Sequence, residues 1–384
     1  MQHQIRIEVV QDLNLLAEHA QAWDQLAVEA PQHLPMLSYA WVVSYLEHQV
    51  EAGNKWWCLF AYDGEDLVGV LPIIIAQGSR FGFEWQSLRA PRDTHTRSGD
   101  LLVAPVPRSV VMTSFISEIE SRIGARFSLK LCGVRESSFT LSLQSCDIPK
   151  AVVLRQPDQS GSFIRVTGSL ADFHARLSDN FRGNLRKAQN KLAKLPKVTF
   201  DVLARDSARA DLLEEFLKLE DSGWKGQEGT SIISSPSLVQ FYDALVRRLS
   251  QRGWLEWHFL RVSGQPIAAQ LAIKFGRCLV ILKIAYDESF SPCAPGNMLF
   301  EHVVERAFAS GEVDEINCLT DMPWHRNWRM ERSSYYDVSI VPFRLLPLAV
   351  EILPLWIRTS LRRIPRLRPL GRILPGSSQY QTGE

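Results

Sequence analysis

Acidic and histidine side chains follow apolar segments at two places in the second half of the sequence. Asp287 and Glu288 come directly after a long apolar run, and Asp321 and His325 follow a second apolar segment. Partial desolvation at a strand end can raise a carboxylate pKa towards the range of a general base, and an Asp with a His can relay a proton. Both places are candidates for acid–base chemistry. The alternatives are carboxylates that cap the following turn, favoured slightly for Glu288, and a structural histidine.

The first of these places also contains a strand, a Pro-Gly turn and a helix. Residues 278–285 are almost entirely apolar, as in a buried strand, and helical periodicity follows from Asn297. A helix N-terminus after a buried strand is a typical place for an anionic ligand, because its free N–H groups and its dipole favour negative charge. We therefore expect Pro295, Gly296 and Asn297 to contact ligand phosphates, with Tyr286 as a neighbouring substrate contact.

Other side chains of the second half are suited to binding a substrate. Trp224 and Trp328 could form the walls of a site, because aromatic rings stack on flat apolar faces. Lys225 follows Trp224 and could contact a phosphate or a carboxylate. The alternatives are core positions for the tryptophans and a solvated surface position for the lysine. Only the tryptophans of the polar segment 320–328 are expected to be hard to bury completely.

The first half contributes one polar loop, residues 91–100, which includes Asp93 and His95. An Asp-x-His pair can ligate a metal, but one pair without further spaced ligands is a weak signal, so no metal site is predicted. We expect Asp93 and His95 to lie in an acceptor-binding loop that faces a cleft between two domains.

Residues 178–195 predict a helix whose basic side chains, including Arg182 and Arg186, share roughly one side. Two interpretations have equal weight. The helix can present a solvated linker face, or it can form a cationic wall that contacts phosphates of a cofactor or an anionic acceptor.

The elements that must position these residues follow one order twice: a strand, two helices, three antiparallel strands, a helix and a strand. A chain of 384 residues with 46% hydrophobic residues also exceeds one ordinary core. We therefore predict domains at 1–160 and 161–342, followed by a basic Pro/Arg-rich tail at 343–384. Expected strands include 99–103, 127–133, 151–154, 278–285 and 335–341, and expected helices include 13–28, 39–50, 108–123 and 237–251.

Several segments resemble a known family. They are FRGNLRKAQNKL from Phe181, Gly-Trp-Lys from Gly223, GQPIAAQLAI from Gly264, YDESFSPCAPGNMLF from Tyr286 and, more weakly, TDMPWHRNW from Thr320. On these segments, residues 178–341 are similar to the GNAT-fold acetyltransferases of the CelD-like, cellulose-biosynthesis type, which are related to Fem-type aminoacyltransferases. The first half resembles a diverged copy, because GEDLVGVLPI from Gly64 corresponds in style to GQPIAAQLAI.

The resemblance implies an α/β (α+β) fold of tandem GNAT-like units, each with a mixed, largely antiparallel sheet flanked by helices. It also implies an N-acyltransferase that uses acetyl-CoA or another acyl-CoA on an amino sugar or other amine in exopolysaccharide or envelope biosynthesis. The expected roles are catalytic for Asp287, Asp321 and His325, cofactor-binding for Pro295, Gly296, Asn297, Arg182 and Arg186, and substrate-binding for Trp224, Lys225, Tyr286, Trp328, Asp93 and His95. The sequence departs from the family at two points: SPCAPG replaces the usual Gly-rich loop, and His325 or Arg326 stands near an expected Lys.

Two other functions remain open. The missing Gly-rich loop and the basic helix favour a Fem-like transferase whose donor is an aminoacyl-tRNA. A non-catalytic scaffold of a polysaccharide-assembly complex is the third hypothesis. The formal net charge of +1 argues against a general nucleic-acid binder, and no sequence-specific nucleic-acid contact is expected.

The remaining features concern location. Six scattered cysteines without a CxxC motif are typical of a reducing compartment, and the N-terminus does not resemble a signal sequence, so we expect a cytoplasmic protein. The tail combines leucines with arginines and could lie on an anionic membrane or contact a polysaccharide synthase. Its prolines favour a strap packed over the domain instead.

Overall fold

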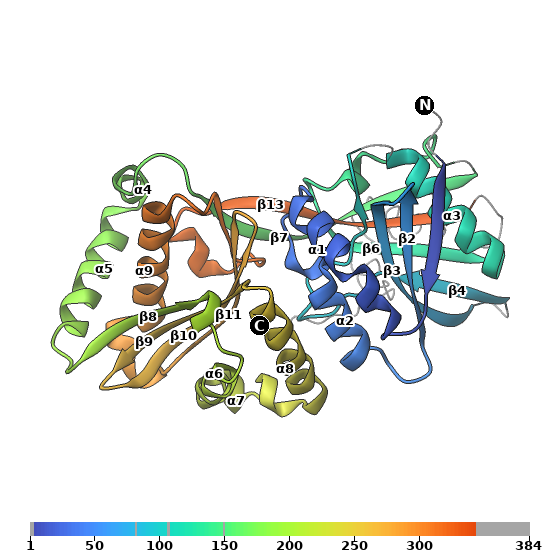
Figure 1. The fold of residues 1–384 in the computed structure, drawn as a ribbon. Helices are drawn as coiled ribbons and strands as arrows, with labels where there is room; N and C mark the ends of the chain where they lie inside the picture. The colour runs from blue at the N-terminus through green and yellow to red at the C-terminus, as the bar shows by residue number, and fades with distance from the viewer. Residues whose placement is uncertain (1–3, 81–82, 106–107, 149, 343–384) are drawn as a thin grey trace, which may run out of the picture.

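The computed structural model describes residues 4–80, 83–105, 108–148 and 150–342. One sheet runs through both halves of this part of the chain, and helices cover its faces (Figure 1). Its strands are β1 (Ile5–Val10), β2 (Lys55–Asp63), β3 (Asp66–Arg80), β4 (Phe83–Arg89), β5 (Leu102–Val103), β6 (Phe127–Arg135), β7 (Ala151–Arg165), β8 (Val198–Ala204), β9 (Leu255–Val262), β10 (Gln265–Phe275), β11 (Cys278–Tyr286), β12 (Glu315–Asn317) and β13 (Glu331–Pro342). The α-helices are α1 (Ala20–Glu29), α2 (Tyr39–His48), α3 (Arg108–Ile123), α4 (Leu170–Arg176), α5 (Asp179–Leu192), α6 (Leu212–Ser222), α7 (Trp224–Gln227), α8 (Pro236–Gln251) and α9 (Pro295–Ser310).

The two halves repeat one topology. Strands β1-β2-β3-β4-β6 are neighbours in the first lobe, and β8-β9-β10-β11-β12 are neighbours in the second. Neighbouring strands are antiparallel except for β4 with β6 and β11 with β12, which are parallel and are connected by α3 and α9. The predicted fold class, a mixed and largely antiparallel sheet flanked by helices, is confirmed.

The last strand of each half pairs with the other lobe. Strand β7 ends the first half but pairs with β12, and β13 ends the second half but pairs with β6. The two strands also pair with each other along most of their length, so they connect the lobes (Figure 1). The predicted domain boundary at residue 160 lies inside β7.

The core between the lobes comes from the helix pairs on one face of the sheet. Helices α1 and α2 share a hydrophobic cluster with α6 and α8, in which the Trp41 ring meets Phe241 edge-on at 5.8 Å between centroids. The other face is covered by α3 in the first lobe and by α5 and α9 in the second. A bidentate ion pair from Arg135 to Glu315, at 2.8 and 2.9 Å, adds a polar contact between the halves.

Several elements differ from the sequence expectation. Strand β7 continues to Arg165 rather than ending at 154, because its polar middle section crosses between the lobes with alternate side chains exposed. The helix expected at 13–28 consists of a 3₁₀ turn, Leu15–His19, followed by α1, and the strand expected at 99–103 is only Leu102–Val103. Strand β4 and helix α4 were not predicted. No disulfide joins the six cysteines.

Within the described residues, no helix has the length and apolar character needed to cross a bilayer. The tail at 343–384, with its predicted membrane or synthase contact, lies outside the described residues.

Candidate functional site

The parallel pair β11 and β12 separates after three residues. Residues 278–280 pair with 315–317, where β12 ends, while β11 continues to Tyr286 beside β10. A bulge at Leu282 lies in the continued part, since Ile281 pairs with Ala272 and Lys283 with Leu271. Bulges of this kind re-aim side chains and are common beside active sites. On the β12 side, residues 281–286 therefore form a strand edge without a neighbour in the described sheet.

Two cavities lie along this edge. The helix cavity, about 320 Å³, lies between the ends of β10 and β11 and the start of α9. The interlobe cavity, about 400 Å³, lies between β11, the segment 318–325 and the loop 91–100 of the first lobe. The cavities share Ile284, Ala285, Tyr286 and Trp324. Ligands in the two cavities would therefore meet at the end of β11.

The N-terminus of α9 opens on the helix cavity. Pro295, Gly296 and Asn297, which were predicted to contact ligand phosphates, line it, and Ala294 precedes them in the left-handed region with φ 44° and ψ 55°. Met298 N donates to Ala294 O at 3.0 Å, whereas no side chain of the described chain caps this helix. The amides of Gly296 and Asn297 are thus available to an anionic ligand, which the helix dipole also favours.

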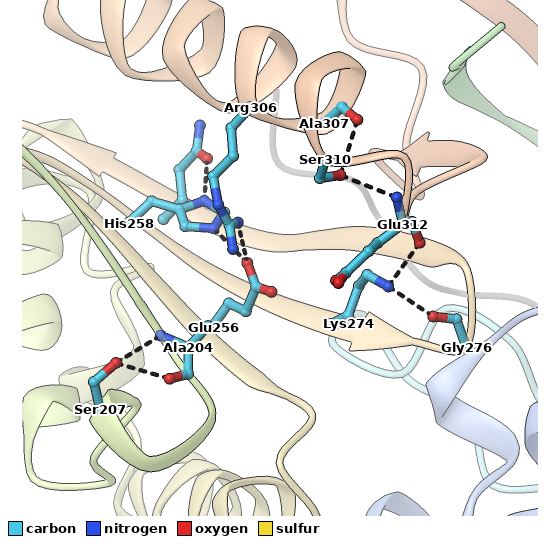
Figure 2. A network of polar contacts seen from close by, with 11 residues as sticks. Ala204, Ser207, Glu256, His258, Lys274, Gly276, Arg306, Ala307, Ser310 and Glu312 are labelled. Atoms are coloured by element: carbon cyan, nitrogen blue, oxygen red, sulfur yellow. Dashed lines mark hydrogen bonds and ion pairs between the residues drawn. The ribbon is translucent and has the colours of Figure 1, made fainter.

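A buried polar network supports the wall of the helix cavity. Gln270, 3% exposed, lines this cavity from β10, and its Oε1 lies 3.0 Å from His258 Nδ1. His258 Nε2 is 3.2 Å from Glu256 Oε2, to which Arg306 of α9 donates at 2.9 Å (Figure 2). One polar atom of the Gln270 amide is thus held by His258, and the other is left for a ligand.

Charged side chains line the interlobe cavity. Lys225 Nζ lies 2.7 Å from Glu220 Oε1 and 3.4 Å from the carbonyl oxygen of Ile284. Glu220 is 4% exposed, and its second oxygen accepts from Ile232 N at 3.0 Å. Lys225, predicted as a phosphate or carboxylate contact, therefore lines the cavity as the partly buried half of an ion pair. Trp224 precedes it in α7, and its side chain lies outside the described part of the structure.

Lys283 projects from the bulged part of β11 and also lines the interlobe cavity. Burial, with a smaller effect of nearby Lys225, lowers the pKa of Lys283 to about 8. Its Nζ lies 5.9 Å from the centroid of the Tyr242 ring, and no group of the described chain accepts a hydrogen bond from it.

The loop 91–100 provides the opposite wall. His95 and Arg97 line the interlobe cavity, and His95 Nδ1 is 3.0 Å from Tyr242 Oη. Burial lowers the pKa of His95 to about 3, so this imidazole is neutral at physiological pH. Asp93 does not line the cavity; its Oδ1 accepts from the N–H groups of His95 at 2.7 Å and Thr96 at 2.6 Å and so shapes the loop.

Asp321 and His325 make structural contacts. The Asp321 carboxylate accepts from Ser160 and Ser162 of β7, at 3.1 and 3.0 Å, and lines neither cavity. His325 does line the interlobe cavity, but its Nδ1 accepts from Met322 N at 3.0 Å. Burial lowers the pKa of His325 to about 4. This geometry favours a neutral histidine that holds the 322–325 turn.

Asp287 caps a turn outside both cavities. Its Oδ1 accepts from the amide and hydroxyl of Ser289, at 2.9 and 2.7 Å, at the start of the 3₁₀ helix Glu288–Cys293. Asp287 instead borders a third hollow, beside Asp211 and Glu214. The alternative that both carboxylates cap the turn therefore holds for Asp287, which precedes the turn and reaches its free amide, but not for Glu288, for which it was slightly favoured.

Three other predicted residues also lie away from the cavities. Trp328 is fully buried, and its Nε1 donates to Asn297 Oδ1 at 3.2 Å, so the expectation of an incompletely buried ring is wrong. Its packing against Phe181 and Phe300 makes it a support for α9. Arg182 pairs with Asp179 on α5, and Arg186 is exposed on the same helix.

The sequence interpretation missed Lys283, Glu220 and Gln270. Each is a polar residue on an otherwise apolar strand or helix face: Lys283 in CLVILKIAY, Gln270 in QPIAAQLAI and Glu220 on the buried side of α6. That interruption of an apolar pattern was the available signal. Across the described residues, no group of three or more His, Cys, Asp or Glu side chains could hold a metal ion.

Comparison with known proteins finds a similar family for part of the chain. Residues 179–326 match the family model described as an acetyltransferase (GNAT) domain, so this part of the chain is similar to GNAT acetyltransferases. This match covers β8 to β12, α9 and the edge of β11. No curated protein matches the sequence.

Solved structures with a similar fold include FemX, with a TM-score of 0.59 and 9% identity over 89% of this chain and 99% of FemX. A conserved protein of unknown function from Bacteroides thetaiotaomicron has a TM-score of 0.54 and 11% identity over 88% of this chain and all of that one. The C-terminal DUF2156 domain of an Agrobacterium fabrum protein has a TM-score of 0.52 and 11% identity, covering 88% and 95%. The TM-scores show that these proteins share the fold of this chain, and at such low identities they show the fold alone.

Proposed function

We propose that the protein is an acyl-CoA-dependent N-acyltransferase that binds its donor in the helix cavity and its amine acceptor in the interlobe cavity. One observation carries this proposal: the two cavities adjoin along the open edge of β11, and the uncapped N-terminus of α9 lies beside the first. The GNAT domain match over the same elements supports it.

The groups of the helix cavity suit the chemistry of an acyl-CoA. The amides of Gly296 and Asn297 would bind phosphate oxygens. The open edge at 281–286 would pair with the amide-bearing arm of the donor, as a sheet edge pairs with an extended peptide. The polar atom of the Gln270 amide that His258 does not hold would hydrogen-bond an amide group of that arm.

The reaction joins the contents of the two cavities. The acceptor nitrogen attacks the thioester carbonyl carbon, a C–N bond forms as the C–S bond breaks, and the thiolate leaves and takes a proton. The nitrogen must lose a proton in the same sequence. Asp287 and Asp321 line neither cavity, so we assign this step to neither of them. The acceptor class, an amino sugar or similar amine of exopolysaccharide or envelope assembly, rests on the resemblance to the CelD-like group.

The variant Asn297→Asp tests the donor site. An aspartate keeps an acceptor oxygen for Trp328 Nε1 and adds a negative charge that the helix N-terminus tolerates, so the fold is retained. The same charge repels a bound phosphate, and calorimetry should show at least a tenfold weaker affinity for CoA and acetyl-CoA.

The matched control is Ser237→Asp, which adds a carboxylate to the exposed first turn of α8. Its CoA affinity should equal that of the wild type. A wild-type protein that binds neither CoA nor acetyl-CoA would overturn the donor assignment.

A second candidate donor is an aminoacyl-tRNA. The exposed cations of α5, among them Arg186 and Lys187, and the absence of the usual Gly-rich loop favour it. This alternative requires tRNA binding that weakens steeply with salt and is reduced by Arg186→Ala with Lys187→Ala. CoA binding without tRNA binding would exclude it.

A further inference from the structure

The interlobe cavity has an excess of positive charge. Lys225, Lys283 and Arg97 line it, whereas Glu220 is the carboxylate that lines it within the described chain. The cations come from α7, from β11 and from the loop 91–100 of the other lobe. They therefore converge on one space from three separate elements.

Two of these cations already have partners. Lys225 pairs with Glu220 at 2.7 Å, and Arg97 donates to the Gln159 side chain. Lys283 differs, because no acceptor of the described chain reaches its Nζ. The cavity wall around it includes Ile281, Leu282 and Leu319, and the Tyr242 ring lies 5.9 Å from its Nζ. A half-buried ammonium in such surroundings is costly unless an anion completes it.

We propose that the interlobe cavity binds an oxyanion of the acceptor substrate, a carboxylate or a phosphate, through Lys283, with Arg97 on the opposite wall. This inference rests on the proposed function and specifies its acceptor as an amine that also carries a negative group. A cavity of about 400 Å³ is the size of a small-molecule site. The oxyanion lies among the cations, and the amine points towards Tyr286, where the two cavities meet.

Protonation of Lys283 must then control the affinity. The groups that influence it are Lys225 and Arg97, which lower its pKa, and Glu220 and Asp93, which raise it, with burial as the largest effect. The pKa of Lys283 is about 8, so the charged form predominates below this value. Oxyanion affinity should fall as the pH rises from 7 to 9, and the bound anion should itself raise the pKa.

The test measures binding of inorganic phosphate and of succinate to the full chain by calorimetry at pH 7. The wild type should bind at least one of them, and the preferred probe distinguishes a phosphate-bearing from a carboxylate-bearing acceptor. Lys283→Met keeps the length of the side chain without its charge and should raise the Kd at least tenfold. Lys283→Arg restores the charge and should recover most of the affinity.

Lys55→Met is the matched control, because Lys55 is exposed at the start of β2 in the other lobe, and it should bind like the wild type. Thermal unfolding of each variant shows that it is folded. Equal affinity of wild type and Lys283→Met, or no binding of either anion, would overturn the inference. CoA titration of the same samples separates the two proposals: CoA binding without anion binding rejects only the oxyanion site, and anion binding without CoA binding rejects only the donor assignment.

Discussion

The two lobes contain the same opening between parallel strands, but only one of them fills it with its own chain. In the first lobe, β4 pairs with β6 over residues 86–89 and 127–130. The chain then leaves the sheet and returns at Gly99, which exchanges hydrogen bonds of 2.8 and 2.9 Å with Cys132 of β6. In the second lobe, the opening between β11 and β12 is bordered by residues 281–286 of β11, which line the two cavities.

The segment that fills the first opening also serves the second lobe. Residues 91–100 lie against β6 on one side, while His95 and Arg97 line the interlobe cavity on the other. The contact with β6 is tight, since a Cβ on Gly133 would lie 2.2 Å from the carbonyl oxygen of Arg97. One segment therefore fills the opening of the first lobe and forms a wall of the cavity beside the second lobe.

The largest effect is expected from Gly133→Ala, which should disturb the contact between the loop 91–100 and β6. Gly133 has φ 64°, and the added Cβ meets Arg97 O, so strain and overpacking should lower the free energy of unfolding by about 2–4 kcal/mol. Denaturant unfolding measures this loss. Gly124→Ala is the control, with φ 74° and no atom within 4 Å of the added Cβ, and should lose only about 1 kcal/mol. Equal losses in the two variants would contradict the tight contact.

The protein should bind one equivalent of acyl-CoA, in the helix cavity of the second lobe, because residues 91–100 fill the opening between β4 and β6 in the first lobe. Saturation at about 100 times the Kd should raise the free energy of unfolding by about 2.7 kcal/mol. Calorimetry gives the stoichiometry, and thermal unfolding gives the stabilisation. A stoichiometry of two would show that the loop 91–100 leaves room for a ligand.

A smaller effect is expected on the free energy of unfolding at acidic pH, through His325 of the interlobe cavity. Burial holds the pKa of His325 at about 4, below its ordinary value of 6.5, so the unfolded chain binds a proton first as the pH falls. Stability is therefore full above about pH 6.5 and is lost towards pH 4, by up to about 1.4 kcal/mol per pH unit. His325→Asn keeps an acceptor for Met322 N. When the free energy of unfolding in urea is plotted against pH between 6.5 and 4, the slope for this variant should be smaller than that of the wild type by up to one proton. An unchanged slope would refute the neutral histidine.

The smallest effect is expected for Asp287→Ala, because Asp287 lies outside both cavities. Loss of the cap on Ser289 should lower the free energy of unfolding by about 0.5–1 kcal/mol, while CoA affinity stays within twofold of the wild type. A loss of CoA binding would instead place Asp287 in the donor site.

The sequence predicted the elements well where the hydrophobic period was strong. Helix α3 was predicted at 108–123 and begins and ends there, because its buried residues follow the helical repeat. Strand β7 was cut short, since its polar middle section lacks an apolar signal. The α9 N-terminus was found from a local pattern of strand, Pro-Gly turn and helix. In contrast, the ion pair of Lys225 with Glu220 and the meeting of Lys283 with the loop 91–100 depend on which segments the fold brings together, and no local pattern carries that information.

The exchange of β7 and β13 bears on how the chain can be divided. A fragment that ends near residue 160 keeps residues 151–160 of β7 but lacks β13, with which they pair, so it exposes the edges of β6 and β7 that β13 covers. Unpaired edges of this length are templates for pairing with another chain. Such a fragment should assemble with its complementary fragment or with a second copy of itself rather than persist as a monomer.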